Sequence, residues 1–158
     1  TWLKVITRIM VKKTNQSMSW LTPLNFLATQ PYFSRLKSNP TGPKDFPDVV
    51  KNVNAFPPNF IHALDAAHML MTASECYKNN IEFVAIHDCF WTHACSVPKM
   101  SIILREKFVD LHSSPILQNL LDDFSSILPE THRGLLPKVP RRGFLELKHV
   151  KNSEFFFC

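Results

Sequence analysis

Glycine is scarce in this chain, with 3 Gly against 12 Pro in 158 residues. The sequence contains neither a Gly-x-x-x-x-Gly-Lys phosphate loop nor a Gly-x-Ser-x-Gly nucleophile elbow, which disfavours P-loop and α/β-hydrolase chemistry. The many prolines predict long, rigid and irregular connections between the regular elements.

Cysteines and long apolar runs are also few. The four cysteines, Cys76, Cys89, Cys95 and Cys158, lack the even, close spacing of a secreted disulfide scaffold, so we expect reduced thiols. The longest apolar run is about half of the ~20 residues that a membrane-spanning helix needs, and no membrane partner is expected. The chain opens at Thr1 within an amphipathic pattern, and we expect it to be a piece of a longer protein.

What the chain does contain is apolar surface and a moderate positive charge. It is 45% hydrophobic with 13 Phe, which is enough to bury the core of one domain. Its net charge of +5 favours polyanionic partners such as nucleic acid, although a moderate excess is weak evidence.

Hydrophobic periodicity predicts an α+β fold, with an antiparallel sheet covered by helices on one side. Helices are expected over residues 2–14, from Pro57-Pro58 to Asn79-Asn80, after Ser96, after Ser114-Pro115 and over 144–150. Strands are expected over 18–22 and 26–30 and in a hairpin over 82–93. Residues 37–56 should form a surface loop, 129–142 a basic connector and 143–158 a C-terminal tail whose phenylalanines dock on the body.

The hairpin carries the leading chemical candidate, Asp88. An apolar strand stops at His87-Asp88 and resumes at Cys89, which places a carboxylate at a rigid tip where it can reach water and bind Mg²⁺. From the local sequence alone, an ordinary turn aspartate is the commoner explanation. His87 should point to the opposite face and be a buried, hydrogen-bonded imidazole.

Other polar residues give weaker signals. His62, Asp65 and His68 recur on successive turns of the long helix, and His68, among apolar neighbours, should be a core histidine with its hydrogen bonds satisfied. Cys89 should be a small core hydrophobe. A zinc site built from His87, Cys89, His93 and Cys95 matches no common spacing. The basic group of Arg133, Lys138, Arg141 and Arg142 is by default a solvated surface.

Two long blocks identify a resemblance. Residues 55–68 (AFPPNFIHALDAAH) followed by residues 84–94 (VAIHDCFWTHA) resemble the C-terminal palm of mitochondrial, phage-type single-subunit RNA polymerases, whose fold is a right hand. The similarity continues through residues 105–112 and 114–118 and reaches the aromatic tail. Asn25-Phe26 departs from the family, which has Gly after the Thr-Pro-Leu segment.

The resemblance implies specific roles. Asp88 would be the second of the two palm aspartates that bind catalytic Mg²⁺, with His87 as its structural companion. His62 would contact the nascent base pair from its minor groove, and Asp65 and His68 would brace the helix that carries it. The tail, with Phe157 and Cys158, would support the active site.

The implied function is DNA-directed RNA synthesis by nucleotidyl transfer in the mitochondrial matrix. The implied partners are template DNA, nascent RNA, nucleoside triphosphates and mitochondrial transcription factors. In this family the first metal aspartate and the fingers helix precede the part aligned with Thr1, so we expect these 158 residues to be inactive alone.

The alternative is a non-catalytic, palm-fold nucleic-acid-binding or scaffold module. A metal-dependent nuclease or phosphatase would need further carboxylates close to Asp88, and the sequence positions of Asp65, Glu75 and Glu82 do not favour this.

Overall fold

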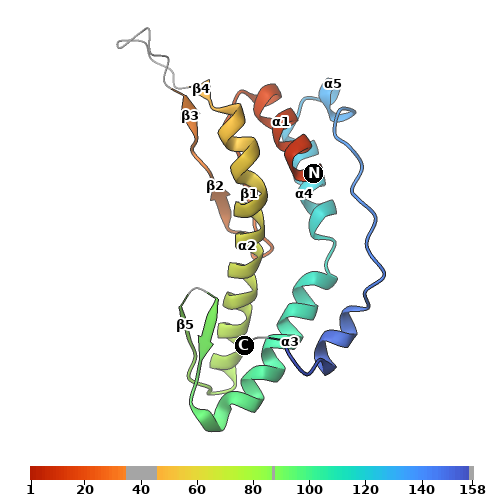
Figure 1. Ribbon diagram of the computed structural model, residues 1–158. Helices are drawn as coiled ribbons and strands as arrows, with labels where there is room; N and C mark the ends of the chain where they lie inside the picture. The colour runs from red at the N-terminus through yellow and green to blue at the C-terminus, as the bar shows by residue number, and fades with distance from the viewer. Residues whose placement is uncertain (35–45, 87, 157–158) are drawn as a thin grey trace. The chain divides into compact units, whose positions relative to one another are not determined.

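The computed structural model describes residues 1–34, 46–86 and 88–156, which form two compact units. The first unit comprises Thr1–Ala63 and Leu117–Arg141, and the second comprises Leu64–Ile116 and Arg142–Cys158. Helices and short antiparallel strand pairs occur together, which confirms the predicted α+β class (Figure 1). Within the described ranges, no helix is both long and apolar enough to cross a bilayer.

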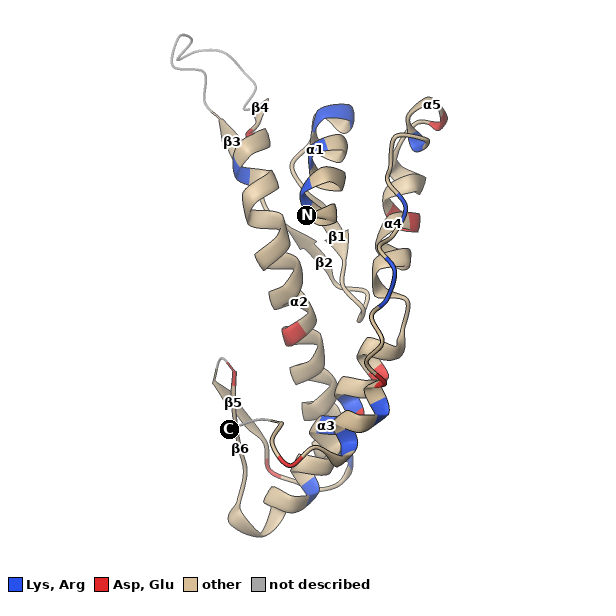
Figure 2. Cartoon of the chain, turned by 45° about the vertical axis from the view of Figure 1, so that its right-hand side comes forward, with Lys and Arg blue, Asp and Glu red and all other residues tan. Residues whose placement is uncertain are grey.

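The first unit is built around Phe56, which is fully buried. Its ring centroid lies 5.1 Å from that of Trp20, edge to face, and 6.2 Å from that of Phe124. The elements that supply this core are α1 (Trp2–Thr14), β1 (Ser19–Leu21), β2 (Leu27–Thr29), the N-terminal half of α2 (Val49–Lys78) and most of α4 (Ile116–Ile127). The amphipathic pattern of α1 is confirmed, since Ile6 and Met10 are buried and its basic residues are exposed. Figure 2 marks the positions of Lys and Arg in blue.

The long helix α2 begins earlier than the sequence predicts. We expected it to follow Pro57-Pro58, but it starts at Val49 and contains both prolines. The expected surface loop over 37–56 is therefore wrong from residue 46 onward, where β4 (Phe46–Pro47) precedes the helix and pairs with β3 (Phe33–Ser34). Residues 37–45 lie outside the described ranges.

Local capping and tertiary packing explain this early start. The Oδ1 atom of Asp48 accepts a hydrogen bond of 3.0 Å from the backbone N–H of Lys51, a typical N-cap contact. The same contact is the main reason that the pKa of Asp48 is lowered. Phe56 and Phe60 are buried on either side of the prolines, and their burial offsets the intrinsic helix cost of proline, about 3 kcal/mol each.

The second unit consists of the C-terminal half of α2 and the elements around it. The elements that join it are β5 (Val84–Ile86), β6 (Cys89–Trp91), η1 (Ala94–Ser96), α3 (Val97–Ser113) and η2 (Leu147–Asn152). Its buried cluster consists of Cys76, Ile81, Met100, Ile103 and Leu104. As predicted, α2 stops at an asparagine in the left-handed region, Asn80, with φ 53°.

The strands do not form the single sheet that we expected. In the described parts of the chain they make three separate two-stranded antiparallel sheets, β1-β2, β3-β4 and β5-β6. Each of the described strands is two or three residues long, so no wider ladder stabilises them. Two of the pairs place an aromatic side chain near α2: Trp20 of β1 meets Phe56, and Phe90 of β6 lies near His68.

The C-terminal region also differs from expectation in detail. The basic connector over 129–142 contains a short helix, α5 (Glu130–Arg133), and the helix expected over 144–150 is the 3₁₀ segment η2. Docking of the tail is correct for Phe156, which packs against the buried cluster of the second unit. It is wrong for Phe155, which remains 79% exposed because Phe156 takes the position against the buried cluster.

Candidate active-site hairpin

The β5-β6 hairpin presents Asp88 to solvent. Ile86 pairs with Cys89, so only two residues connect the strands, and Asp88 is an exposed member of that connection. The paired Ala85 and Phe90 are half-buried, whereas the strand positions next to them are exposed. His87, the other residue of the connection, lies outside the described ranges, as do Phe157 and Cys158.

Aromatic side chains hold the hairpin against the rest of the second unit. The ring centroid of Phe90 lies 5.6 Å from that of Phe83 and 6.3 Å from that of His68. At the open end of the hairpin, the hydroxyl of Thr92 donates a hydrogen bond to the carbonyl of Glu82. Packing of this kind limits the rotamers of Phe90 and holds β6, the strand that follows Asp88, in place.

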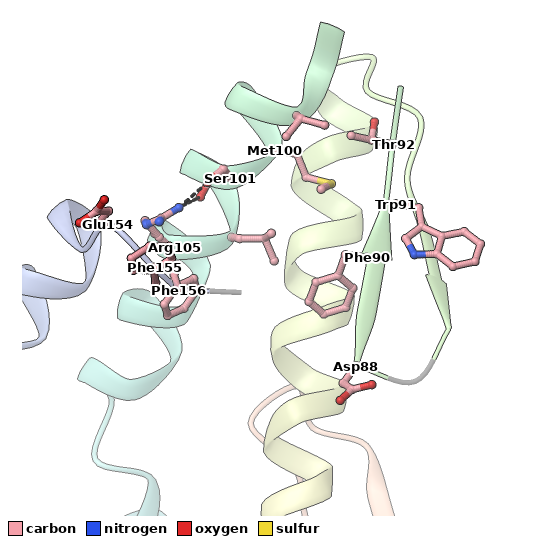
Figure 3. Close-up of a pocket in the computed structure, with 12 residues that line it drawn as sticks. Asp88, Phe90, Trp91, Thr92, Met100, Ser101, Arg105, Glu154, Phe155 and Phe156 are labelled. Atoms are coloured by element: carbon pink, nitrogen blue, oxygen red, sulfur yellow. Dashed lines mark hydrogen bonds between the residues drawn. The ribbon is translucent and has the colours of Figure 1, made fainter. Parts of the chain in front are cut away.

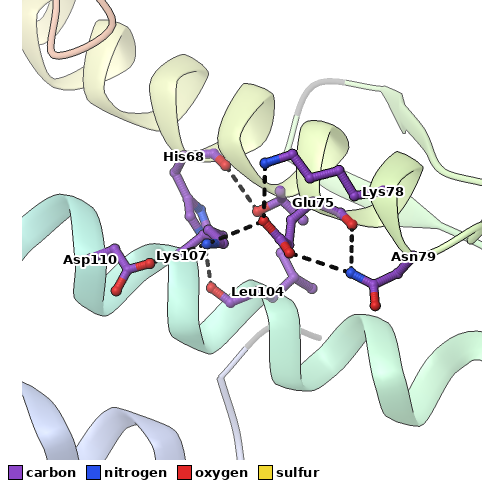
Figure 4. Close-up of polar contacts among 8 residues, drawn as sticks. His68, Glu75, Lys78, Asn79, Leu104, Lys107 and Asp110 are labelled. Carbon is purple, nitrogen blue, oxygen red and sulfur yellow. Dashed lines mark hydrogen bonds and ion pairs between the residues drawn. The ribbon is translucent and has the colours of Figure 1, made fainter.

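His68 is a buried histidine with a hydrogen-bond partner, as its apolar neighbours predict. It is 4% exposed, and its Nε2 atom lies 2.9 Å from the carbonyl oxygen of Leu104 on α3 (Figure 4). Burial lowers the pKa of His68, and burial together with the nearby His68 lowers the pKa of His112. An ion-pair cluster joins the same two helices, with Lys107 Nζ at 3.4 Å from Glu75 and at 3.2 Å from Asp110.

Arg105 is a residue that sequence reasoning missed. Its Nη2 atom donates a 3.0 Å hydrogen bond to the carbonyl of Ser153. Its guanidinium carbon lies 5.4 Å from the centre of the Phe156 ring, and Figure 3 shows these two side chains next to each other. Phe156 also lies edge to face with Phe108, with centroids 5.1 Å apart. These contacts tie the tail to α3. No local pattern signals them, because the hydrogen-bonded residues are 48 positions apart.

A pocket of about 460 Å³ lies between the hairpin, α3 and the tail. Its charged lining residues are Asp88, Arg105 and Glu154 (Figure 3). Asp88 is an exposed carboxylate, and oxygen ligands of this kind suit Mg²⁺. Within the described ranges, however, no group of three or more His, Cys, Asp or Glu side chains lies together as a metal site. Asp88 therefore fits as one ligand of a site that needs others.

The remaining candidates lie on other elements of the chain or on the outward face of the hairpin. His62 is exposed on the part of α2 that belongs to the first unit, and Asp65 is exposed one turn later, in the second. Cys89 is exposed, so its predicted role as a core hydrophobe is wrong. The reason is register: Cys89 lies opposite Ile86 on the outward face, and Phe90 takes the inward position. The three described cysteines are free thiols, as expected.

Comparison with known proteins decides the family. The sequence profile of the DNA-dependent RNA polymerases matches residues 1–134 of this chain. The chain belongs to the DNA-dependent RNA polymerase family. The two blocks that carry the resemblance, residues 55–68 and 84–94, both lie within the matched part. The resemblance identified from the sequence is therefore confirmed.

Individual polymerases of plant organelles are similar over nearly the whole chain. DNA-directed RNA polymerase 3, chloroplastic, of Nicotiana sylvestris is 41% identical over 99% of this chain and 17% of its own length. DNA-directed RNA polymerase 2, chloroplastic/mitochondrial, of Arabidopsis thaliana is 42% identical over 99% of this chain. DNA-directed RNA polymerase 1B, mitochondrial, of Nicotiana tabacum is 39% identical over the same share. The chain thus spans about a sixth of the length of these RNA polymerases.

Proposed function

We propose that this chain forms the C-terminal palm portion of an organellar DNA-directed RNA polymerase and that Asp88 is a metal-binding residue of its active site. The observation that carries the proposal is the exposed Asp88 carboxylate at a two-residue turn, in a chain that belongs to this polymerase family. An aspartate that only forms a turn does not need aromatic packing under its hairpin. A metal ligand binds better when such packing holds it in a fixed position.

Asp88 would hold Mg²⁺ together with carboxylates from parts of the polymerase outside the described residues. Bound Mg²⁺ stabilises negative charge on the attacking and leaving oxygens of nucleotidyl transfer. The contribution of this chain is orientation: Phe90 and His68 support the hairpin, and His87, as its neighbour, is proposed as a structural companion. Arg105 and the tail through Phe157 and Cys158 are proposed to support the same hairpin from the other side of the pocket.

His62 is proposed to contact nucleic acid at the nascent base pair, since it is exposed on the helix that bears the family block. Asp65 and His68 would brace that helix. The substrates would be template DNA, the growing RNA and nucleoside triphosphates. We also propose that the polymerase works in the mitochondrial matrix with transcription factors of that compartment; a fluorescent fusion of the full-length protein found only in another compartment would contradict this.

Replacement of Asp88 tests the central proposal. In the full-length polymerase, Asp88→Asn keeps the shape of the side chain but removes the charge that binds metal. RNA synthesis on a primed template should fall by at least about a thousandfold, the equivalent of losing ~4 kcal/mol of transition-state stabilisation. DNA binding, measured by fluorescence anisotropy, should be nearly unchanged.

Glu82→Gln is the matched control, since Glu82 is an exposed carboxylate of the same hairpin segment and lies away from the turn. It should leave synthesis close to that of the wild type. Asp88→Asn protein that still elongates RNA at a similar rate would overturn the metal-binding role and favour a non-catalytic nucleic-acid-binding or scaffold module.

A further inference from the structure

Helix α2 has a continuous helical backbone, but its backbone hydrogen bonding is interrupted at two adjacent positions. Pro57 and Pro58 lie inside it and have no N–H to donate, so the carbonyls of Val53 and Asn54 receive no helical hydrogen bond from these positions. A helix missing two adjacent bonds bends and frays more readily than its neighbours. His62 lies just over one turn beyond this weak point.

The side chain of Gln30 spans the weak turn. Its Nε2 atom donates to the backbone carbonyl of Asn52, at 3.0 Å, and to the Oδ1 atom of Asn52, at 3.1 Å. Its Oε1 atom accepts a hydrogen bond of 3.0 Å from Nδ2 of Asn59. Asn52 precedes the prolines and Asn59 follows them. One amide group thus connects α2 to itself across the two missing bonds, with both of its donors and its acceptor in use.

Gln30 is itself held firmly. It is 3% exposed, and its backbone N–H donates to the carbonyl of Met18 at 3.0 Å. Asn52 is fully buried, and its Nδ2 atom donates to the carbonyls of Tyr32 and Asp48, each at 2.9 Å. A buried, fully paired network of this kind fixes a single arrangement, because any displaced member would leave a polar atom without a partner.

We infer that Gln30 is a positioning residue for His62. It connects the turns of α2 before and after Pro57-Pro58, and this fixes the position of the turn that carries His62. The inference rests on the proposed contact between His62 and nucleic acid. All of the residues in this argument belong to the first unit, so it does not depend on how the two units are arranged. Gln30 would touch no substrate and would act only through the helix.

The first test measures the local stability of α2 just after the prolines and does not measure activity. Gln30→Leu keeps the approximate size of the side chain and removes its three hydrogen bonds with α2, two to Asn52 and one from Asn59. In the full-length polymerase, amide hydrogen exchange over residues 59–62 should become faster than in the wild type. Thr7→Val is the matched control, because Thr7 is equally buried in the same unit and its hydroxyl donates only within its own helix, to Leu3. Unchanged exchange in Gln30→Leu, or an equal change in Thr7→Val, would overturn the inference.

The second test asks whether Gln30 acts through His62. The readout is the ratio of kcat/KM for the templated nucleotide to that for a mismatched one. Gln30→Leu should lower this ratio by about three- to tenfold, the size expected for one or two hydrogen bonds. His62→Ala should lower it at least as much, and the double variant should match His62→Ala alone.

The outcomes separate the two hypotheses. If His62→Ala lowers selectivity and Gln30→Leu lowers it by the same factor in both backgrounds, Gln30 does not act through His62, and the inference fails while the role of His62 stands. If His62→Ala leaves selectivity unchanged, the proposed role of His62 fails and the inference fails with it. The proposal for Asp88 is measured separately in either case.

Discussion

At the scale of single residues, burial decides the chemistry of the histidines. His68 is surrounded by the rings of Phe90, Phe108 and Phe156, and its Nε2–H donates a hydrogen bond to the carbonyl of Leu104. His62, by contrast, is exposed. The same residue type therefore serves as a structural group in one turn of α2 and as a candidate contact in another.

The buried His68 should make stability depend on pH. Its pKa in the folded chain is lowered, first by burial, below the ordinary value of 6.5. As the pH falls through about 6.5, the unfolded state takes up a proton that the folded state resists, so stability present at pH 7.5 is lost toward pH 5.5. The free energy of unfolding should fall over this range by at most about 1.4 kcal/mol per pH unit for one group, and the unfolding temperature should fall with it.

The variant His68→Gln, which cannot titrate but can still donate to Leu104, should show a shallower decline. Part of the slope should persist, because burial also lowers the pKa of His112. Thermal unfolding followed by circular dichroism between pH 5.5 and 8 checks this. An identical slope in wild type and variant would show that His68 is not the group responsible.

At the scale of elements, the first turn of α2 depends on Asn52. Asn52→Ala should destabilise the chain by about 2–4 kcal/mol, because it removes a fully buried amide, its hydrogen bond to the carbonyl of Tyr32 and the acceptor of the buried Met18 N–H. Asn54→Ala is the control on the same helix, since Asn54 is exposed and its Oδ1 accepts an exposed hydrogen bond from Lys4; it should change stability by about 0.5 kcal/mol or less. Urea unfolding of both variants measures the difference, and equal midpoints would contradict the role given to Asn52.

The same helix shows where sequence reasoning reaches its limit. The regular apolar spacing after Pro58 predicted the helix, and Asn79-Asn80 predicted its end, because both signals are local. Its beginning could not be predicted in the same way. The prolines argue for a boundary, and the contacts that overrule them come from Trp20, Gln30 and Phe124, which are remote in sequence.

At the scale of the whole chain, Arg105 governs whether the tail stays docked. Arg105→Met keeps the length of the side chain but removes the charge-assisted bond to Ser153 and the cation–π contact with Phe156. Together these are worth about 1–3 kcal/mol. Hydrogen exchange over residues 147–156 should therefore rise. Lys99→Met, at an exposed position of α3, should leave it unchanged. Equal protection in the two variants would show that Arg105 does not hold the tail.

The candidate site follows the same division between local and remote signals. The hairpin and the exposed Asp88 could be predicted from an apolar run broken by a polar pair, and the burial of His68 from its neighbours. The exposure of Cys89 could not, because a strand with apolar residues on both faces does not reveal which face is covered. The contacts of Arg105 with the tail depend on residues that only the folded chain brings together.

The two prolines of α2 also have a spectroscopic consequence. Sequential assignment of an NMR spectrum steps from one backbone amide to the next, and Pro57 and Pro58 have no amide proton. The walk along this helix must stop at Phe56 and resume at Asn59, even though the helix itself is unbroken. Asn59, whose side chain also meets Gln30, is thus the first magnetic reporter beyond the gap.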